Sequence, residues 1–401
     1  MSRHLHTAVA LDGVGWHPAA WRLDADNARR LHDADYWLEL ALQAESGHLD
    51  LLTIDDTLAL QSETYGDPVP RTDRVRGRLD SVLIASRIAP LTSAIGLVPT
   101  VVTTHTEPFH VAKAIATLDF VSSGRAGVRL KVGPTRTEAR LVGRREFPSF
   151  DLTDADDPEI KKIVLAAFQE AADVTEVLRR LWDSWEDDAE IRDAATGRFI
   201  DRDKLHYVDF AGEWFSVKGP LTVPRSPQGQ SIVSVLGHGT DPYRLGALGS
   251  DLIYVTPQDT QHAVGIVDEI RWIEESVHRL PPRARVLGDV VVVLGDTEQA
   301  AAARLSELDE LAGEPLQSDA LIFSGTPAQL ADLVEAWADA GLNGIRFRPA
   351  TNAVDLPRLV HDVVPELQRR GLQREGYLGR TLRENLGLSR PSSRYAVQEA
   401  S

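Results

Sequence analysis

The chain has 401 residues, of which 43% are apolar, so it is long enough to bury a large core. Its formal net charge of −17 argues against binding to nucleic acid or to an anionic membrane, because both attract a basic patch. It contains no cysteine, which excludes disulfides, thiolate metal sites, iron–sulfur clusters and a cysteine nucleophile.

The N-terminal quarter alternates strands with helices. Runs of apolar and β-branched residues predict strands over residues 5–11, 49–54 and 93–98. Residues 35–45 and 79–87 have the apolar spacing of amphipathic helices. An order of strand then helix, repeated, is typical of an α/β protein.

Residues 107–133, EPFHVAKAIATLDFVSSGRAGVRLKVG, form the most informative segment. Residues 107–121 have the spacing of an amphipathic helix, and Gly124 ends it. Residues 128–132 then alternate apolar side chains with Arg129 and Lys131, which predicts a strand carrying two cations on one face.

The remaining elements complete a regular series. Further strands are predicted over 231–236, 252–255, 286–294 and 344–347, and further helices over 160–185, 242–248, 261–278, 297–311, 327–340 and 355–370. Eight strands with helices between them predict an α/β fold, a (β/α)₈ TIM barrel, as a single domain. A doubly wound sheet is the alternative, but no G-x-G-x-x-G follows the first strand.

Two stretches interrupt this alternation. Residues 185–230 are polar and contain Gly and Pro, and a stretch this long between two barrel units is expected to be an insertion over the barrel mouth. The basic, Gly-rich tail, 371–401, is expected to pack on a neighbouring surface or subunit.

The sequence also predicts where the protein resides. The apolar run near the N-terminus is too short for a signal peptide, and no stretch approaches the roughly 20 apolar residues of a membrane span. The histidines are scattered, without the spacing of a metal site. We therefore expect a soluble cytoplasmic protein without a metal ion.

Seven strings occur in an order that resembles a known family. They are HPAAWR (17–22), EPFHVAKAIATLDFVSSGRAG (107–127), LWDSWEDDA (181–189), GRFIDRDKLHYVDFAGEWFSVKGPL (197–221), PQG (227–229), VVPELQRRG (363–371) and TLRENLGL (381–388). Together they resemble one branch of the bacterial luciferase-like flavin-dependent monooxygenases. That branch contains nitrilotriacetate monooxygenase component A, dibenzothiophene-sulfone monooxygenase and one of the polypeptides of pristinamycin synthase.

The resemblance implies a function that composition and periodicity do not. It implies a TIM barrel, usually a homodimer, that uses reduced FMN from a separate flavin reductase, with O₂ and a small organic substrate. Sister branches use a deazaflavin, which is the alternative cofactor. Such a site must hold the flavin ring in a dry pocket and anchor its phosphate, at the C-terminal ends of the strands.

Several cofactor positions depart from the family pattern. After GRAG the family continues with Trp-Asn, two apolar residues and Thr-Ser, where this chain has residues 128–133, so that Arg129 replaces the Asn and Val132–Gly133 the hydroxyl pair. The family's Arg-Tyr falls on residues 167–168, Ala-Phe. Lost hydroxyls remove hydrogen bonds worth roughly 1.5–3 kcal/mol each to a charged acceptor, so these changes predict an altered flavin pocket.

Other positions keep the pattern in part. The family's Gln-Ala-Gly and following hydroxyl residues match 235–239, where Gly237 is kept and His238 replaces a small residue. Asp56 matches the family's Asp, and Thr103 and Thr104 match its Ser-Thr region. His238 is expected either to contact phosphate or to fill that space.

These comparisons give a set of candidate site residues. The candidate cofactor ligands are Asp56, Thr103, Thr104, Arg129, Lys131, Gly237 and His238. His17, in the loop after the first strand, and His105 are candidate general acid–base groups, because imidazole titrates near neutral pH. The alternative for His17 is a cap on local backbone.

Two hypotheses follow. In the first, the chain is a two-component monooxygenase in which Arg129 and Lys131 hold an anionic group. In the second, it is a catalytically silent barrel that serves as a partner or ligand-binding subunit, with Asp55 and Asp56 paired to those cations, because an unpaired buried ion is costly. An ion pair in the barrel mouth favours the second hypothesis.

Overall fold

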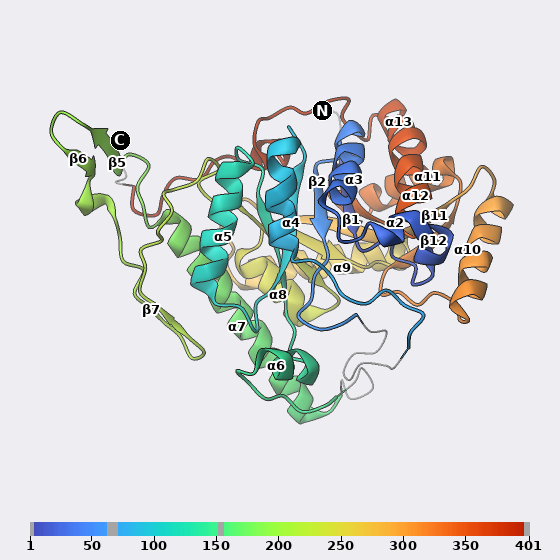
Figure 1. Ribbon diagram of the computed structural model, residues 1–401, viewed down its shortest axis with the longest axis horizontal. Coiled ribbons are helices and arrows are strands. Elements are labelled where there is room, and N and C mark those ends of the chain that lie inside the picture. The colour runs from blue at the N-terminus through green and yellow to red at the C-terminus, as the bar shows by residue number, and fades with distance from the viewer. Residues whose placement is uncertain (1–3, 62–70, 151–155, 397–401) are drawn as a thin grey trace.

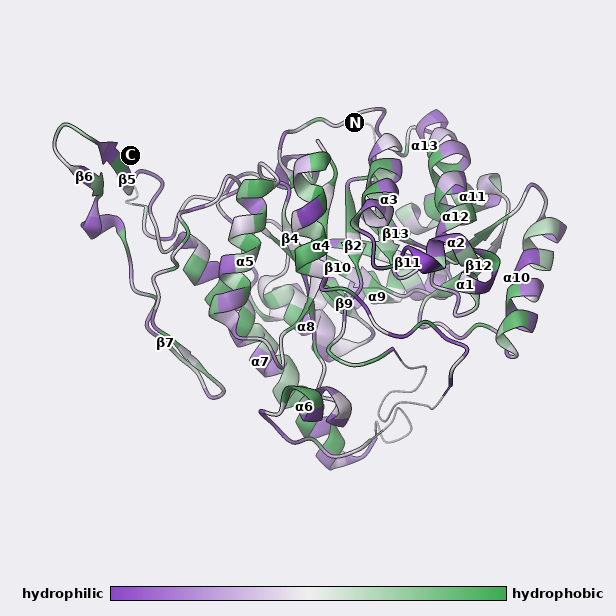
Figure 2. Ribbon diagram, in the orientation of Figure 1, coloured by the Kyte–Doolittle hydropathy of each residue, from purple (hydrophilic) through white to green (hydrophobic). Residues whose placement is uncertain are grey.

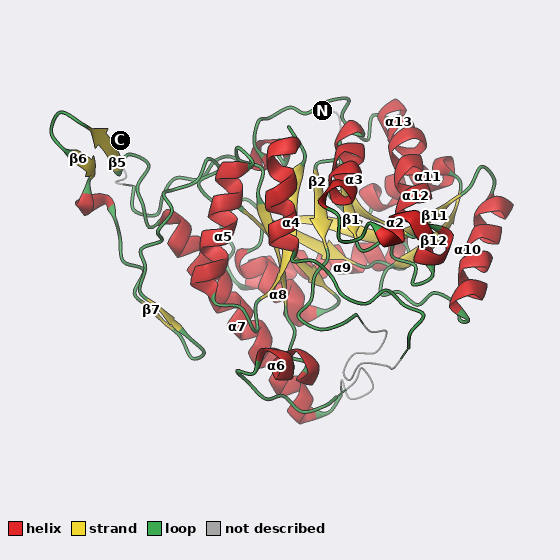
Figure 3. Ribbon diagram, viewed as in Figure 1, coloured by secondary structure: helices red, strands yellow, loops and turns green. Residues whose placement is uncertain are grey.

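The computed structural model describes residues 4–61, 71–150 and 156–396. Its centre is a closed barrel of eight parallel strands inside a layer of helices (Figures 1 and 3). Around the barrel the strands are β1 (His6–Leu11), β2 (Leu51–Ile54), β3 (Gly96–Val102), β4 (Gly127–Lys131), β9 (Ile232–Gly237), β10 (Leu252–Val255), β11 (Arg285–Leu294) and β13 (Gly344–Pro349). Pairing of β13 with β1 closes the ring, which confirms the predicted (β/α)₈ barrel.

Helices follow the strands and cover them from outside. The larger ones are α3 (Ala34–Ser46), α4 (Ser81–Ile88), α5 (Pro108–Val121), α7 (Pro158–Asp183), α8 (Thr240–Gly249), α9 (Thr260–Ser276), α10 (Glu298–Ala312) and α11 (Pro327–Asp339). The shorter ones are α1 (Ala20–Leu23), α2 (Ala25–Arg29), α6 (Arg136–Val142), α12 (Asn352–Arg358), α13 (Val364–Arg369) and α14 (Leu382–Asn385). Figure 2 shows apolar strands beneath helices whose outer faces are polar, as expected for a parallel sheet covered by helices. No described helix is both long and apolar enough to cross a membrane.

The strand register brings polar side chains together inside the barrel. Arg346 on β13 lies beside Asp289 on β11, and Thr100 on β3 lies beside Arg129 on β4. All four side chains are buried. Because all strands are parallel, their C-terminal ends meet at one rim, which we call the mouth.

The main sheet contains a ninth strand that the sequence did not predict. β12 (Leu321–Gly325) pairs with residues 290–294 of β11, beyond the part of β11 that pairs with β10. The strand predicted over 93–98 was also early by several residues, because β3 continues through Pro99, which lies opposite Ile54. These errors leave the barrel order unchanged.

The tail closes the opposite end of the barrel, which we call the bottom. Leu382, Leu386 and Leu388 are buried in one apolar cluster with inward-facing residues of the first strands, including Ala8 and Leu51. The surface on which the tail packs is therefore its own barrel. Residues 397–401 of the predicted tail lie outside the described residues.

The insertion does not cover the mouth, contrary to the prediction. It forms two small hairpins, β5 (Glu190–Asp193) with β6 (Arg198–Ile200), and β7 (Phe210–Ala211) with β8 (Ser216–Val217). Its return segment binds the start of β4, where Gln228 Nε2 donates to the carbonyl of Ala126 (2.8 Å). The insertion begins at the C-terminal end of α7. Because α7 runs antiparallel to the strands, this end lies at the bottom of the barrel, away from α6 (Figure 1).

Candidate functional site at the barrel mouth

An ion pair lies in the centre of the mouth. Arg129 of β4 donates to Asp55, which follows β2, and its Nε donates to Thr100 Oγ1 (2.9 Å). Arg78 contacts both Asp55 (3.1 Å) and Asp12 (2.7 Å). Burial raises the pKa of Asp55, but the positive charges of Lys131, Arg129 and Arg78 lower it by more. The net shift of the pKa is downward, so the carboxylate stays charged.

The neighbouring carboxylate, Asp56, has a different environment. It accepts backbone hydrogen bonds from Thr57 (2.7 Å) and Ser81 (2.9 Å), and Lys131 Nζ donates to its main-chain carbonyl (3.0 Å). Burial raises its pKa despite the two backbone donors. Asp56 therefore anchors the start of α4 to the end of β2.

A second network crosses the barrel beside the first. Asp289 is fully buried and accepts from Arg346 Nε (2.8 Å) and Arg348 Nε (2.9 Å). Burial would raise its pKa, but the two arginines produce a net decrease. Arg348 also binds Asp319 (2.6 Å), whose pKa falls to about 2 because Arg348 outweighs the opposing effect of burial.

Aromatic rings cover the two arginines of this network. The guanidinium of Arg346 lies 3.8 Å from the ring centre of Tyr254, and that of Arg348 lies 4.7 Å from the ring centre of Trp16. Such contacts stabilise a cation in a site with little water. The mouth is therefore an ordered polar surface.

The loops after β3 and β4 are held together by the predicted polar residues. Thr103 Oγ1 donates to the carbonyl of Lys131 (3.1 Å), and the backbone N–H of Gly133 donates to Thr104 Oγ1 (3.0 Å). His105 Nε2 lies 3.0 Å from the carbonyl of Gly133. A carbonyl accepts only, so Nε2 carries the proton and Nδ1 has a lone pair.

His105 retains an unused polar atom. Its Nδ1 is buried and has no hydrogen-bond partner among the described residues. Burial lowers the pKa of His105, which favours the neutral ring with an accepting Nδ1. Other described residues also contain buried polar atoms without a partner, so it is the position of His105 at the mouth that makes its Nδ1 a candidate ligand contact.

His17 is committed to local contacts. It is 1% exposed, its Nδ1 accepts from the backbone N–H of Ala19 (3.1 Å) and its Nε2 lies 3.1 Å from Asp309. Burial lowers its pKa. Both ring nitrogens are engaged, which is the geometry of the structural alternative rather than of a general base.

His238 and Gly237 lie at the end of β9. The His238 side chain is 49% exposed, with Nδ1 3.1 Å from Thr256 Oγ1 and Nε2 3.5 Å from Asp319. Burial of part of the ring lowers its pKa. The side chain connects the ends of β9 and β10 to the segment before β12.

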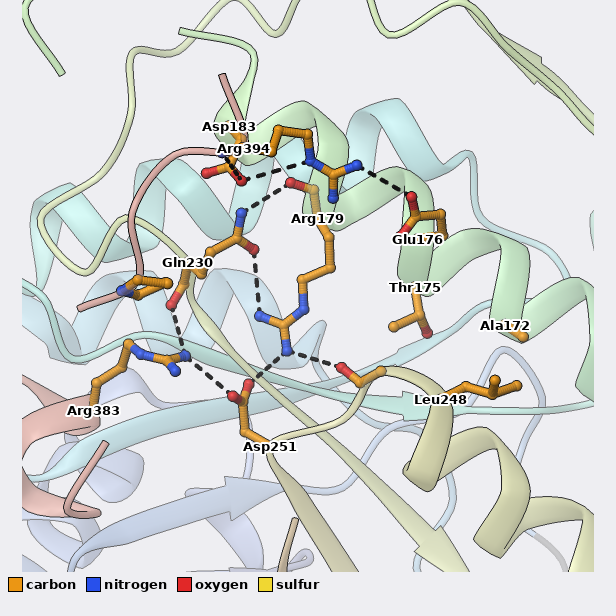
Figure 4. A pocket seen from close by; sticks show the side chains of 12 residues that line it. Ala172, Thr175, Glu176, Arg179, Asp183, Gln230, Leu248, Asp251, Arg383 and Arg394 are labelled. Atoms are coloured by element: carbon orange, nitrogen blue, oxygen red, sulfur yellow. Dashed lines mark hydrogen bonds and ion pairs between the residues drawn. The ribbon is translucent and has the colours of Figure 1, made fainter. Parts of the chain in front are cut away.

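A cavity of about 430 Å³ lies beside the mouth, within the range of ~300–1,000 Å³ typical of ligand sites. Its walls come from residues 12–18 after β1, from Gln61, from Arg74, Val75 and Arg78 before α4, and from residues 314–317 before β12. A smaller cavity of about 310 Å³ lies at the bottom (Figure 4). No group of three or more potential metal ligands gathers in the described parts of the chain.

The mouth contains functional candidates that the sequence analysis missed. Arg346 and Arg348 alternate in GIRFRP as Arg129 and Lys131 do in GVRLK, so the same pattern predicts both pairs. Asp289 interrupts a run of apolar residues in β11, which is also a readable signal. Arg78 lies in irregular chain and carries no such signal.

Comparison with known proteins identifies this barrel. A sequence model of the family described as luciferase-like monooxygenase matches residues 16–344. The chain belongs to this family. It is 30% identical to N-acetyl-S-(2-succino)cysteine monooxygenase of Bacillus subtilis (strain 168), over 98% of this chain and 99% of that protein.

Other members agree with this assignment. Nitrilotriacetate monooxygenase component A of Aminobacter aminovorans is 28% identical, over 95% of this chain and 96% of that protein. The crystal structure of long-chain alkane monooxygenase superposes with a TM-score of 0.82 at 22% identity, and covers 96% of each chain. The relatives are monooxygenases, and the family's fold extends over almost the whole chain.

Proposed function

We propose that the chain is a two-component monooxygenase that uses reduced FMN, supplied by a separate flavin reductase, and O₂ to oxidise a small organic substrate. The observation that carries this proposal is the unused hydrogen-bonding capacity at the mouth of a luciferase-like barrel. Lys131 makes one described hydrogen bond, and His105 Nδ1 makes none.

These residues fit a flavin. A flavin ring offers carbonyl acceptors and an N–H donor along one edge, and an ammonium and an accepting imidazole could each complement one group of that edge. Lys131 would therefore bind a ring carbonyl, and His105 would accept from the ring. Gly237 and His238 would face the phosphate, as candidates at the end of β9.

The other site residues would act through these contacts. Thr103 and Thr104 hold the loops that carry Lys131 and His105. Arg129 is occupied by Asp55, so it would be a positioning residue. When bound, reduced FMN supplies the electrons that activate O₂, and the protein's task is to orient substrate and exclude water.

A second candidate function has its own support. The Asp55–Arg129 pair and the Asp289 network place neutralised charges across the mouth, as expected for a silent barrel that serves as a partner subunit. In that case flavin would not bind. The homodimer and the reductase partner expected from the resemblance belong to the first proposal.

Flavin titration separates the two candidates. We expect anaerobically reduced FMN to bind with a dissociation constant in the micromolar range, followed by flavin absorbance, and oxidised FMN to bind more weakly and to lose fluorescence on binding. A parallel titration with a deazaflavin tests the alternative cofactor. Dissociation constants above about 1 mM for both redox states of FMN would exclude the monooxygenase and leave the silent barrel.

A further inference from the structure

The cavity beside the mouth has one charged wall. Arg78 Nε donates to Asp12 (3.1 Å), and its Nη2 contacts Asp12 and Asp55. Its remaining nitrogen, Nη1, has no hydrogen-bond partner among the described residues. The two carboxylates raise the pKa of Arg78 against the effect of burial, so the guanidinium is always charged.

The carboxylates that line the same cavity already accept hydrogen bonds from arginines. Both carboxylate oxygens of Asp12 accept from Arg78, and Oδ1 also accepts from Gln61 Nε2 (3.4 Å). Glu314 accepts from Arg71 (2.6 Å) and Arg74 (2.8 Å). A cationic ligand would have to compete with these arginines, whereas an anion can use Arg78 Nη1 directly.

A neutral acceptor lies in the same wall. Gln61 Oε1 is buried and has no partner among the described residues, while its amide nitrogen faces Asp12. The amide oxygen can accept one hydrogen bond from a ligand N–H or O–H. The wall therefore combines a permanent cation with an unsatisfied acceptor.

The lining of the cavity also has an apolar and aromatic part. It includes Trp16, Val75, Pro315 and Leu316. Trp16 Nε1 donates to the carbonyl of Ala10 (2.7 Å), and Arg348 packs on its ring, so its orientation is fixed. A fixed aromatic wall favours a ligand with an apolar or planar part.

We propose that this cavity is the substrate pocket, and that it takes a small organic carboxylate whose anionic group binds Arg78 and whose apolar part packs on Trp16. The assignment rests on the proposed monooxygenase function and specifies its substrate class. It places the substrate anion on Arg78, whereas Arg129 and Lys131 remain candidates for holding an anionic group of the cofactor.

The test uses 4-fluorobenzoate as the probe and ¹⁹F line broadening as the measurement, without flavin. 4-Fluorobenzamide is the neutral control of the same shape. We expect 4-fluorobenzoate to bind with a dissociation constant of about 1–10 mM, as is usual for a ligand of this size. The amide should bind at least about tenfold more weakly, because it lacks the charge.

Substitutions of the lining residues show where the two probes bind. Arg78→Gln should weaken 4-fluorobenzoate at least about tenfold and leave the amide unchanged, whereas Arg87→Gln, at an exposed arginine of α4, should change neither. Arg78→Lys keeps the charge opposite Asp12 and Asp55 and should retain part of the affinity even where Arg78→Gln is unstable. Trp16→Leu should weaken both probes.

The results of these binding measurements either support or overturn the proposed carboxylate pocket. Equal binding of the two probes, no binding of 4-fluorobenzoate below about 50 mM, or unchanged binding in folded Arg78→Gln protein would overturn the proposal. The measurement requires no cofactor, so a protein that binds 4-fluorobenzoate through Arg78 but fails the FMN titration would lose the proposed function and keep the anion pocket.

Discussion

The two ends of the barrel contain similar buried ion pairs in different surroundings. At the bottom, Asp251 binds Arg179 (2.6 Å) and Arg383 (3.1 Å) (Figure 4), and the leucines of the tail seal the space below the strands. At the mouth, arginines and aspartates also pair, and a cavity of about 430 Å³ lies beside them. Both ends contain buried polar atoms without a described hydrogen-bond partner, His105 Nδ1 at the mouth and Arg374 Nε at the bottom. The contrast teaches that neither a buried charge nor an unsatisfied polar atom marks a site by itself.

This difference matches the usual division of labour in the fold. Residues at the C-terminal face of a TIM barrel carry chemistry, and those at the N-terminal face carry stability. The bottom cavity has charged walls, yet Arg394 is bound by Glu176 (3.2 Å), and Arg179 by Asp251 and Gln230. We therefore expect substitutions at the bottom to change stability, and substitutions at the mouth to change ligand binding as well.

The largest effect is expected at the fully buried carboxylate of the mouth. Asp289→Asn leaves Arg346 and Arg348 without their shared counter-charge and should lower the free energy of unfolding by about 3–5 kcal/mol. Urea denaturation measures the change. Asp296→Asn, at an 84% exposed side chain, is the control and should have no measurable effect. A small effect of Asp289→Asn would mean that the network is solvated.

At the bottom, the tail makes a comparable contribution through apolar packing. Leu386→Ala removes a fully buried side chain and should cost about 2–5 kcal/mol in the same measurement. Leu378→Ala, in the same tail but 81% exposed, provides the matched control. If both variants unfold at the same urea concentration as the unmodified protein, the tail does not seal the barrel.

The barrel could be predicted from the sequence, and the site only in part. Eight strands followed from continuous apolar runs, because strands buried on both faces need them. Asp56 and Lys131 became candidates because one follows a predicted strand and the other lies near the end of one, and they remain predictions together with His105. The pairing of Arg129 with Asp55 was foreseen only as an alternative, because a partner choice depends on side-chain distances between strands that a single sequence does not contain. The predicted position of the insertion differed from the structure for a related reason, because contacts of Gln228 at the bottom determine the path of its return segment.

Low pH should reduce the stability of the folded protein by protonating Asp251 at the bottom of the barrel. Burial raises the pKa of Asp251, but Arg179 and Arg383 lower it to about 2, from an ordinary value of 3.8. A lowered folded-state pKa contributes stability that is present above pH ~4 and is lost as the pH falls towards ~2, here about 2.5 kcal/mol in total. The stability difference between the unmodified protein and Asp251→Asn should therefore narrow between pH 6 and pH 2.5. A constant difference would show that the pair does not shift this carboxylate.

The smallest change is expected in cofactor affinity. Lys131→Met removes one charge-assisted hydrogen bond worth about 1.5–3 kcal/mol, so reduced FMN should bind roughly 10–100-fold more weakly. Lys113→Met, at an exposed position of α5, is the control and should leave the affinity unchanged. Equal affinities of Lys131→Met and the unmodified protein would remove Lys131 from the cofactor site.

The central claim is that the mouth, and not the bottom, takes the flavin. Hydrogen exchange followed by mass spectrometry, with and without saturating FMN, tests it directly. We expect slower exchange in segments 100–110 and 127–138, which carry His105 and Lys131, and no change in 171–183 or 383–394. Protection confined to the bottom segments, or no protection anywhere at a concentration where FMN binds, would contradict it.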